Sequence, residues 1–223
     1  MKIIIKIFLF LLVLNVNTKA NENYSFGLPS YWESLKKVQK NFYMKGALDS
    51  MGYYLWNNAP DTERDILISQ YRFCIKKKSE NFQRYMFMLG WNKEENAATE
   101  IYKGSSAACS NLSETKEFKD IVIEKKPLEN VIKKVWAELT DKDKAAYIAG
   151  YVDGSLDTVR SIIKNPNATK DDVDYYQNSL NTIYKCFENK GFLNLIPFII
   201  KREINDSYPV AWNISFSMGA FCR

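Results

Sequence analysis

The stretch "YIAGYVDG" at residues 147–154 places two glycines, Gly150 and Gly154, inside a segment with helical character. A glycine in a helix interior costs about 1 kcal/mol relative to alanine, so two of them need a physical reason. Residues four apart lie on one helix face. We therefore expect this helix to present a smooth face against which another helix backbone packs closely. A substrate-binding role for the same residues is the alternative.

A related stretch, "YMKGALDS", occupies residues 43–50. In it Ser50 stands where the later stretch has Gly154, so both carry a small residue four positions after the shared glycine. A constant offset of 104 residues aligns five identical pairs: Trp32/Trp136, Leu35/Leu139, Tyr43/Tyr147, Gly46/Gly150 and Asp49/Asp153. Such self-similarity at a fixed spacing indicates a duplicated unit.

The first 20 residues are typical of a secretory signal peptide, with two early lysines, an apolar run over 3–14 and a small residue, Ala20, at the expected cleavage site. A retained membrane anchor is the alternative, but the uncharged run 7–14 is far shorter than the ~20 residues a span requires. Cleavage near Ala20 predicts a periplasmic or secreted protein. It also lowers the net charge from +5 to +2, because three lysines leave with the peptide. The basic composition is therefore no argument for nucleic-acid binding.

The four cysteines follow the same duplication. Cys74 and Cys186 are 112 residues apart, and Cys109 and Cys222 are 113 apart. An even number of cysteines in an exported chain indicates a disulfide framework. The duplication predicts one bridge in each copy, Cys74–Cys109 and Cys186–Cys222, and bridges between the copies are the alternative.

Helix signals dominate both copies. We expect helices over residues 31–56, 62–76, 79–90 and 93–109 in the first copy, the first of them opened by a capping box of Ser30 and Glu33. In the second copy Thr140 with Asp143, and Thr169 with Asp172, predict further helix starts. The predicted fold is all-α, with two similar small helical bundles in tandem, each containing one disulfide. The predicted boundaries are 1–20 for the signal peptide, 21–110 for the first domain, 111–127 for a linker and 128–223 for the second domain.

The chain contains no histidine, which excludes zinc sites built on histidine and hydrolases that need a histidine base. It also lacks the glycine-rich motifs of nucleotide and phosphate sites. We therefore predict no catalytic, cofactor-binding or metal-binding residue. Asp49, Asp153 and Asp157 are the candidate carboxylates, since paired carboxylates can perform acid–base chemistry. A duplicated helix Asp that accepts a hydrogen bond from a neighbouring helix end or hydroxyl is the simpler account.

The "YMKGALD" and "YIAGYVD" stretches are followed by "FCI" (73–75) or "KCF" (185–187), and each copy closes with a cysteine in "AAC" or "AFC". This pattern resembles the Rap/Tai-type immunity family. The resemblance implies an exported, all-helical, disulfide-bonded bacterial protein that binds and blocks a peptidoglycan amidase toxin delivered by type VI secretion. The chain departs from the family in having two copies and in lacking a proline soon after the first motif cysteine, where Lys76 or Glu188 stands nearby.

These observations predict a non-enzymatic binding protein whose partner is a protein, for example a cell-wall hydrolase, with no nucleic-acid partner and no stable membrane insertion. The loops 57–61 and 165–172 are the candidate segments for insertion into an active site. Two alternatives remain: an envelope or ligand-binding protein that uses an apolar cavity between the copies, and an enzyme whose carboxylates gather in an open cleft.

Overall fold

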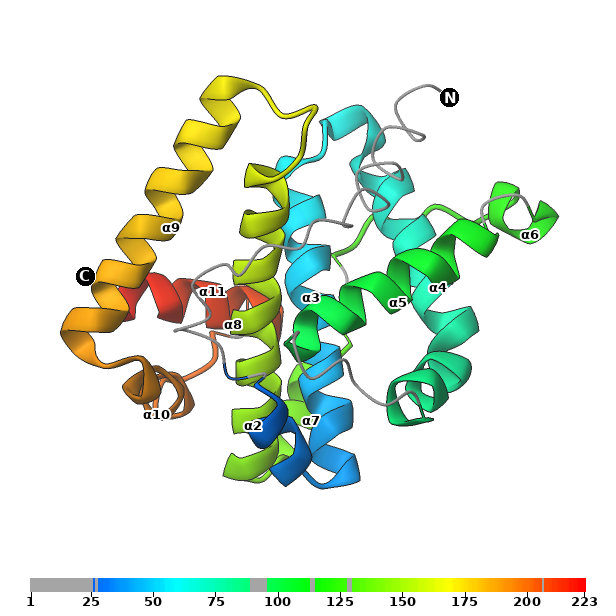
Figure 1. Cartoon of the computed structure of the whole chain (residues 1–223). Coiled ribbons are helices and arrows are strands. Elements are labelled where there is room, and N and C mark those ends of the chain that lie inside the picture. Colours follow the sequence, from blue (N-terminus) through cyan, green and yellow to red (C-terminus); the bar gives the residue numbers. More distant parts are fainter. Residues whose placement is uncertain (1–25, 27, 89–95, 113–114, 128–129, 206) are drawn as a thin grey trace.

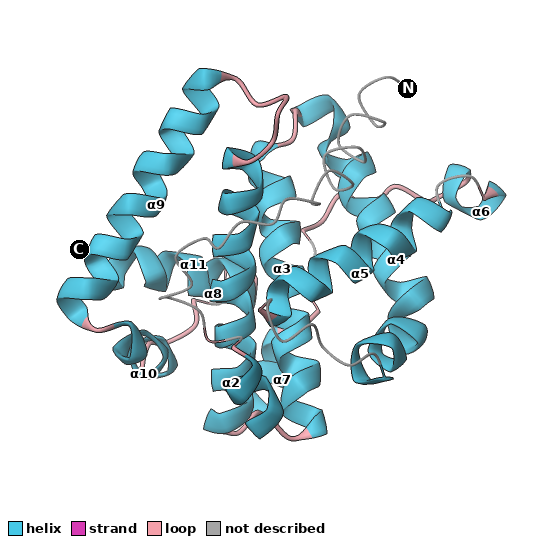
Figure 2. Ribbon diagram, viewed as in Figure 1, coloured by secondary structure: helices cyan, strands magenta, loops and turns pink. Residues whose placement is uncertain are grey.

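The computed structural model describes residues 26, 28–88, 96–112, 115–127, 130–205 and 207–223. Within these ranges all regular structure is helical and there is no strand, which confirms the all-α prediction (Figure 2). In chain order the elements are α2 (Pro29–Ser34), α3 (Lys37–Asn58), α4 (Asp61–Met88), α5 (Ala97–Leu112), α6 (Lys116–Lys119), α7 (Lys133–Glu138), α8 (Asp141–Ile163), α9 (Lys170–Lys190), the 3-10 turn η1 (Phe192–Asn194), α10 (Leu195–Ile200) and α11 (Val210–Phe221).

The element boundaries keep the spacing seen in the sequence. Helices α2 and α7 start 104 residues apart, and so do α3 and α8. Both short helices end in the same way, because the N–H of Leu35 bonds to the carbonyl of Trp32 and the N–H of Leu139 bonds to that of Trp136. The last helix of each copy, α5 or α11, starts at an offset of 113 residues.

The two long helices that carry the repeated stretches, α3 and α8, lie against each other along their length and form the most extensive helix contact of the fold. They run in the same direction, with both N-termini at the lower end in Figure 1. Helix α5 of the first copy packs on α8, and α11 of the second copy packs on α3. One connected apolar core, reaching from Phe26 to Phe221, therefore draws on both copies. The predicted domain boundaries stay predictions.

Both predicted disulfides are confirmed. Cys74–Cys109 joins α4 to α5 with a Cα–Cα distance of 5.2 Å, and Cys186–Cys222 joins α9 to the residue after α11 with a distance of 5.4 Å. The first bridge forms a small apolar cluster of its own with Phe118, whereas Cys186 belongs to the main core.

The predicted starts of α8 and α9 are confirmed, since the hydroxyls of Thr140 and Thr169 accept the N–H groups of Asp143 and Asp172. The predicted capping by Ser30 is wrong. Helix α2 begins at Pro29 with Leu28 as its N-cap, because the fixed φ of proline suits the first turn.

The uninterrupted helix predicted over 31–56 is also wrong. The chain is extended at Leu35 and Lys36, and the backbone N–H of Lys36 bonds to Oε1 of Gln39 at 2.9 Å, which starts α3 as a separate helix. Conversely, α4 continues through Ser79, where the sequence predicted a new helix.

The segment predicted as a linker is partly helical. Helix α5 extends to Leu112 and α6 follows at 116–119. Of the three apolar residues at 121–123, only Ile121 packs on the small cluster around the first disulfide, while Val122 is 81% exposed. The part after α6 is anchored to α4, because Arg72 pairs with Glu124 at 3.1 Å and donates to the carbonyl of Lys126.

The predicted signal peptide lies outside the described residues. Among the helices that are described, none combines the length and the apolar character that crossing a bilayer would demand.

Candidate functional site

The two motif aspartates each accept a hydrogen bond from a tyrosine of the other copy. The hydroxyl of Tyr43 on α3 donates to Oδ2 of Asp153 on α8 at 2.5 Å. The hydroxyl of Tyr147 on α8 donates to Oδ2 of Asp49 on α3 at 2.6 Å. The structure thus brings together four of the six motif residues predicted from the sequence, in two reciprocal pairs across the α3–α8 contact.

Each aspartate also holds the chain just before a short helix. Oδ1 of Asp153 accepts the backbone N–H of Phe26 at 2.9 Å, ahead of α2. Asp49 accepts the backbone N–H of Asn130 at 3.0 Å, ahead of α7, and the side-chain amide of Asn130 at 2.7 Å. Phe26 and Asn130 are themselves 104 residues apart, so the same bond is made at the same place in each copy. Hydrogen bonds to an ionised carboxylate are about twice as strong as neutral ones.

The site is closed to solvent. Asp49, Asp153, Tyr43 and Tyr147 are at most 1% exposed. Burial, and then the charge of Asp153, raise the pKa of the Tyr43 hydroxyl well above its ordinary value. Tyr43 is therefore a neutral donor at physiological pH, which is the form that the Asp153 carboxylate requires.

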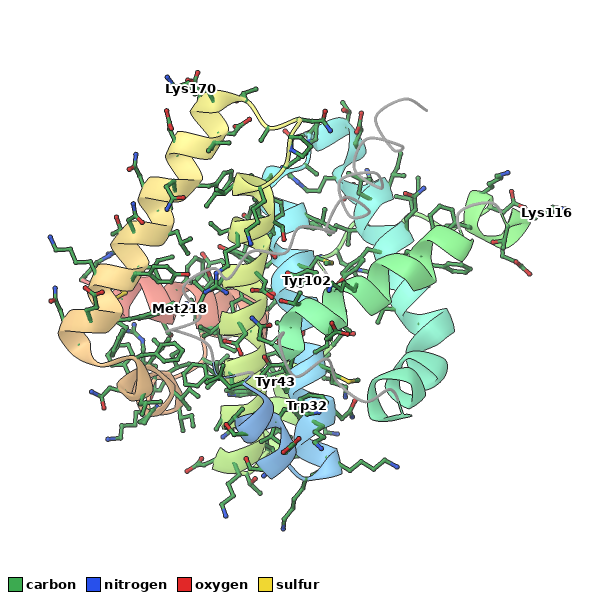
Figure 3. All side chains as sticks on the ribbon, viewed as in Figure 1. Trp32, Tyr43, Tyr102, Lys116, Lys170 and Met218 are labelled. Carbon is green, nitrogen blue, oxygen red and sulfur yellow. A yellow bond between two sulfur atoms is a disulfide. The ribbon has the colours of Figure 1, made fainter. Side chains whose placement is uncertain are left out.

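The motif tryptophans pack against the rings of the motif tyrosines. Trp32 meets Tyr43 edge to face with ring centroids 5.6 Å apart, and Trp136 meets Tyr147 in the same way at 5.7 Å. Figure 3 shows Trp32 and Tyr43 close together at the α2 end of the molecule. The repeated tryptophan found in the sequence therefore orients the hydroxyl that reaches the other copy.

The motif glycines allow the two backbones to touch. A Cβ added to Gly46 would overlap the carbonyl oxygen of Tyr147, and one added to Gly150 would overlap that of Tyr43. A Cβ on Gly154 would come within 2.9 Å of the Ala47 backbone. The predicted close helix contact is confirmed at these positions, and its partner is the matching helix of the other copy, which the sequence alone did not identify.

Asp157, the third candidate carboxylate, belongs to a different network. Its Oδ2 accepts the hydroxyl of Thr99 at 2.5 Å, and its Oδ1 accepts the guanidinium of Arg160 at 2.9 Å and the amide of Asn96 at 3.3 Å. The guanidinium also donates to the hydroxyl of Tyr184 at 2.7 Å. Through these bonds α8 is tied to α5 of the first copy and α9 of the second.

Sequence reasoning missed several members of these networks. Asn96 and Thr99 have no identical counterpart at the repeat offset, and the bond made by Phe26 comes from its backbone, which no residue type reveals. The hydroxyl of Tyr102 donates to the carbonyl of Gly154 at 2.8 Å and also meets the hydroxyl of Thr158. Figure 3 labels Tyr102 where α5 crosses the paired helices. Asn96, Thr99 and Tyr102 could have been predicted only if the packing of this part of the first copy on α8 had been known.

The described part of the chain contains no cluster of three or more metal-ligating side chains. The three candidate carboxylates are buried, and each is occupied by hydrogen bonds from tyrosine, threonine, amide or backbone donors. The arrangement fixes helices relative to one another and leaves none of these carboxylates facing solvent.

The two loops predicted as insertion segments lie at one end of the molecule, opposite α2 and α7 (Figure 1). They are brought together from α3 and α9, since the hydroxyl of Tyr176 donates to Oδ1 of Asn58 at 3.2 Å and approaches the hydroxyl of Tyr54 at 3.3 Å. Asn57, Asn58, Pro166 and Asn167 are exposed there.

Comparison with known proteins gives no relative from which a function could be transferred. The chain matches no protein-family model, no curated protein and no solved structure.

Proposed function

We propose that this chain is an exported, non-enzymatic protein inhibitor whose target is a peptidoglycan amidase. The observation that carries the non-enzymatic part is the burial of Asp49 and Asp153, each of which accepts hydrogen bonds from a tyrosine and a backbone N–H. A general acid or base must reach the substrate proton directly or through one water, and neither carboxylate does so. The fold uses these groups for rigidity.

Two further features support export. The predicted signal peptide precedes a chain with two intramolecular disulfides, and such bridges persist in oxidising compartments. The described residues contain no free cysteine. The amidase as target is implied by the resemblance of the repeated motif to the Rap/Tai-type family.

The inhibitory surface in this proposal is the end formed by the loops 57–61 and 165–172. Parallel alignment of α3 and α8 places the loops that follow both helices at that end, and the Tyr176–Asn58 bond links the first loop to α9, four residues after the second loop. A paired-loop tip on a rigid helical base loses little conformational entropy on binding, which favours tight association.

The test is an inhibition assay with purified, disulfide-intact protein and purified type VI-delivered peptidoglycan amidases, scored by release of cleaved peptide from cell-wall sacculi. We expect stoichiometric inhibition of at least one amidase. Asn167→Trp, at an exposed position of the loop tip, should weaken inhibition at least about tenfold, because the larger side chain hinders entry of the loop into the active site. Leu193→Trp, at an exposed position near α10, is the matched control and should inhibit normally.

Full activity of every amidase in the presence of folded protein would reject the target class. Hydrolysis of cell-wall material by the chain itself, lost in Asp157→Asn or Asp49→Asn, would reject the non-enzymatic role. Equal inhibition by both tryptophan variants would keep the amidase as the target but would reject the loop tip as the inhibitory surface.

A further inference from the structure

Helix α9 begins at the loop tip and presents an exposed face in its first turns. Asp171, Asp174, Tyr175 and Asn178 have the spacing that places residues on one side of a helix, and all four are exposed. Figure 3 labels Lys170, the first residue of α9, at the same end of the molecule as the loop tip. We call the four exposed residues the Tyr175 face.

Tyr175 is the unusual member of this face. Its side chain is 67% exposed, although burying a large ring normally lowers the free energy. The helix start accounts for Asp171, because acidic residues in the first turn interact favourably with the helix dipole, but it requires neither Asp174 nor Tyr175. Tyrosine is one of the residue types that contribute most to binding, since it offers a large contact area at a low entropy cost.

The ring of Tyr175 packs on a tyrosine that the fold holds in place. It meets the ring of Tyr176 edge to face, with centroids 5.2 Å apart. The hydroxyl of Tyr176 donates to Asn58 at 3.2 Å and lies 3.3 Å from the hydroxyl of Tyr54, so Tyr176 is anchored on α3. A side chain that is supported in this way before contact loses less entropy when it binds.

The charge around Tyr175 indicates which kind of partner this face fits. The first six residues of α9 contain three aspartates and one lysine. Carboxylates repel the phosphates of nucleic acids and the headgroups of anionic lipids. They attract a positively charged protein surface and speed its approach. An exposed tyrosine beside these carboxylates therefore fits a protein that has an apolar pocket with a basic rim.

We propose that Tyr175 anchors the inhibited amidase. Its ring fills an apolar pocket beside the amidase active site, and Asp171 and Asp174 meet basic side chains on the rim of that pocket. This inference rests on the proposed function and adds a contact outside the two loops. Tyr175 lies about 7.5 Å along the helix axis from Lys170, so an interface of standard size covers both the loop tip and the Tyr175 face.

Inhibition constants of disulfide-intact variants, measured against an amidase that the wild-type chain inhibits, test the anchor. Tyr175→Ala should weaken inhibition at least about thirtyfold, the loss expected for a central interface tyrosine. Tyr175→Phe keeps the ring and should stay within about threefold of the wild type. Because Tyr175 is exposed, both variants should fold normally, as circular dichroism and thermal unfolding would show.

Tyr208→Ala is the matched control. Tyr208 is also a partly exposed tyrosine, 39% exposed, and its ring also packs on another aromatic ring, that of Trp212. It lies just before α11 and outside the Tyr175 face. Its replacement should leave inhibition unchanged.

Association rates measured by surface plasmon resonance test the contribution of charge. Wild-type association should slow at least about tenfold between roughly 0.05 and 0.5 M salt, because salt screens the attraction. The double variant Asp171→Asn, Asp174→Asn should associate about fivefold more slowly at low salt and should depend less on salt.

Normal inhibition by folded Tyr175→Ala overturns the anchor and leaves the amidase as the target. Equal weakening by Tyr208→Ala also overturns it, since the loss would not be specific to the Tyr175 face. Association that does not respond to salt, or that is unchanged in the double variant, overturns the basic rim. If the wild-type chain inhibits no amidase, the proposed function fails and the anchor fails with it.

Discussion

The phenolic oxygen of Tyr43 lies 2.5 Å from a carboxylate oxygen of Asp153, a residue 110 positions later and in the other copy of the repeat. The same bond is made in reverse by Tyr147 and Asp49. Each copy thus supplies one hydrogen-bond donor and one acceptor to the other. Asp49 and Asp153, which the sequence offers as candidate catalytic carboxylates, connect the two copies instead.

Replacing Gly150 by alanine should lower the free energy of unfolding by about 3 kcal/mol, at the upper end of the usual cost of overpacking, because the new methyl group meets the backbone of Tyr43. Urea denaturation measures the change. Gly219→Ala is the control: this glycine lies in a helix with open space around it, so alanine should stabilise the protein by about 0.5–1 kcal/mol. Equal effects of the two substitutions would contradict the close contact.

Replacing Asp157 by asparagine should destabilise the protein by about 3–5 kcal/mol, because it leaves the Arg160 guanidinium buried without its counter-ion. Asp61→Asn breaks an ion pair of the same i,i+3 geometry with Arg64, but the Asp61 side chain is 87% exposed, so the cost should stay below about 1 kcal/mol. Thermal or urea unfolding of the two variants gives the comparison. A small effect at Asp157 would show that this network contributes little.

Stability should fall steeply above pH 10. Burial raises the pKa of Tyr43 well above its ordinary value of 10.0, and burial with the Asp153 charge raises the pKa of Tyr31 to about 12. Above pH 10 the unfolded chain loses phenolic protons that the folded chain retains. The unfolded state then binds fewer protons, so the free energy of unfolding decreases by about 1.4 kcal/mol per pH unit for each such tyrosine.

Urea unfolding at a series of pH values between 8 and about 11.5 measures this slope. Below the ordinary tyrosine pKa the tyrosine contribution should be constant. Tyr43→Phe should reduce the alkaline slope by about one proton, and an unchanged slope would show that Tyr43 titrates alike in both states.

Removing the second disulfide by the double replacement of Cys186 and Cys222 with alanine should cost about 4 kcal/mol on the chain-entropy model, given a sequence separation of 36 residues. The Cys74/Cys109 double replacement, with a separation of 35, should cost a similar amount. Calorimetry gives both values. Peptide mass mapping of the native protein must recover only the two pairs within the copies, and a cross-copy peptide would refute the assignment.

Much of the fold could be predicted from residue identities, and the limits have physical causes. Cysteine spacing gave both bridges, because a duplicated unit repeats its own crosslink. The glycine spacing predicted a smooth helix face, but it could not predict which helix packs on that face. The structure shows that Gly46 and Gly150 each contact the backbone of the other copy. Ser79 has the residue type of an N-cap, yet α4 continues past it, because a residue type that favours a helix start does not by itself end the helix before it.

The sequence predicted the recurring residues of the candidate site but not the groups that bind to them. Tyr43, Asp49, Tyr147 and Asp153 stood out because they recur. Their remaining partners are Phe26, which acts through its backbone N–H, and Asn130, which uses its backbone N–H and its side-chain amide. Every residue except proline has a backbone N–H, so residue type does not identify such a donor.

The double-mutant cycle of Tyr147→Phe and Asp49→Asn, measured by urea unfolding, tests most directly whether the two copies are joined by this exchange. Each single replacement should cost about 1–3 kcal/mol, and the pair should show a coupling energy of at least about 1 kcal/mol, since the two groups share one buried hydrogen bond. Strictly additive effects would mean that Tyr147 and Asp49 do not meet, and the account of the molecule as two interlocked halves would then be wrong.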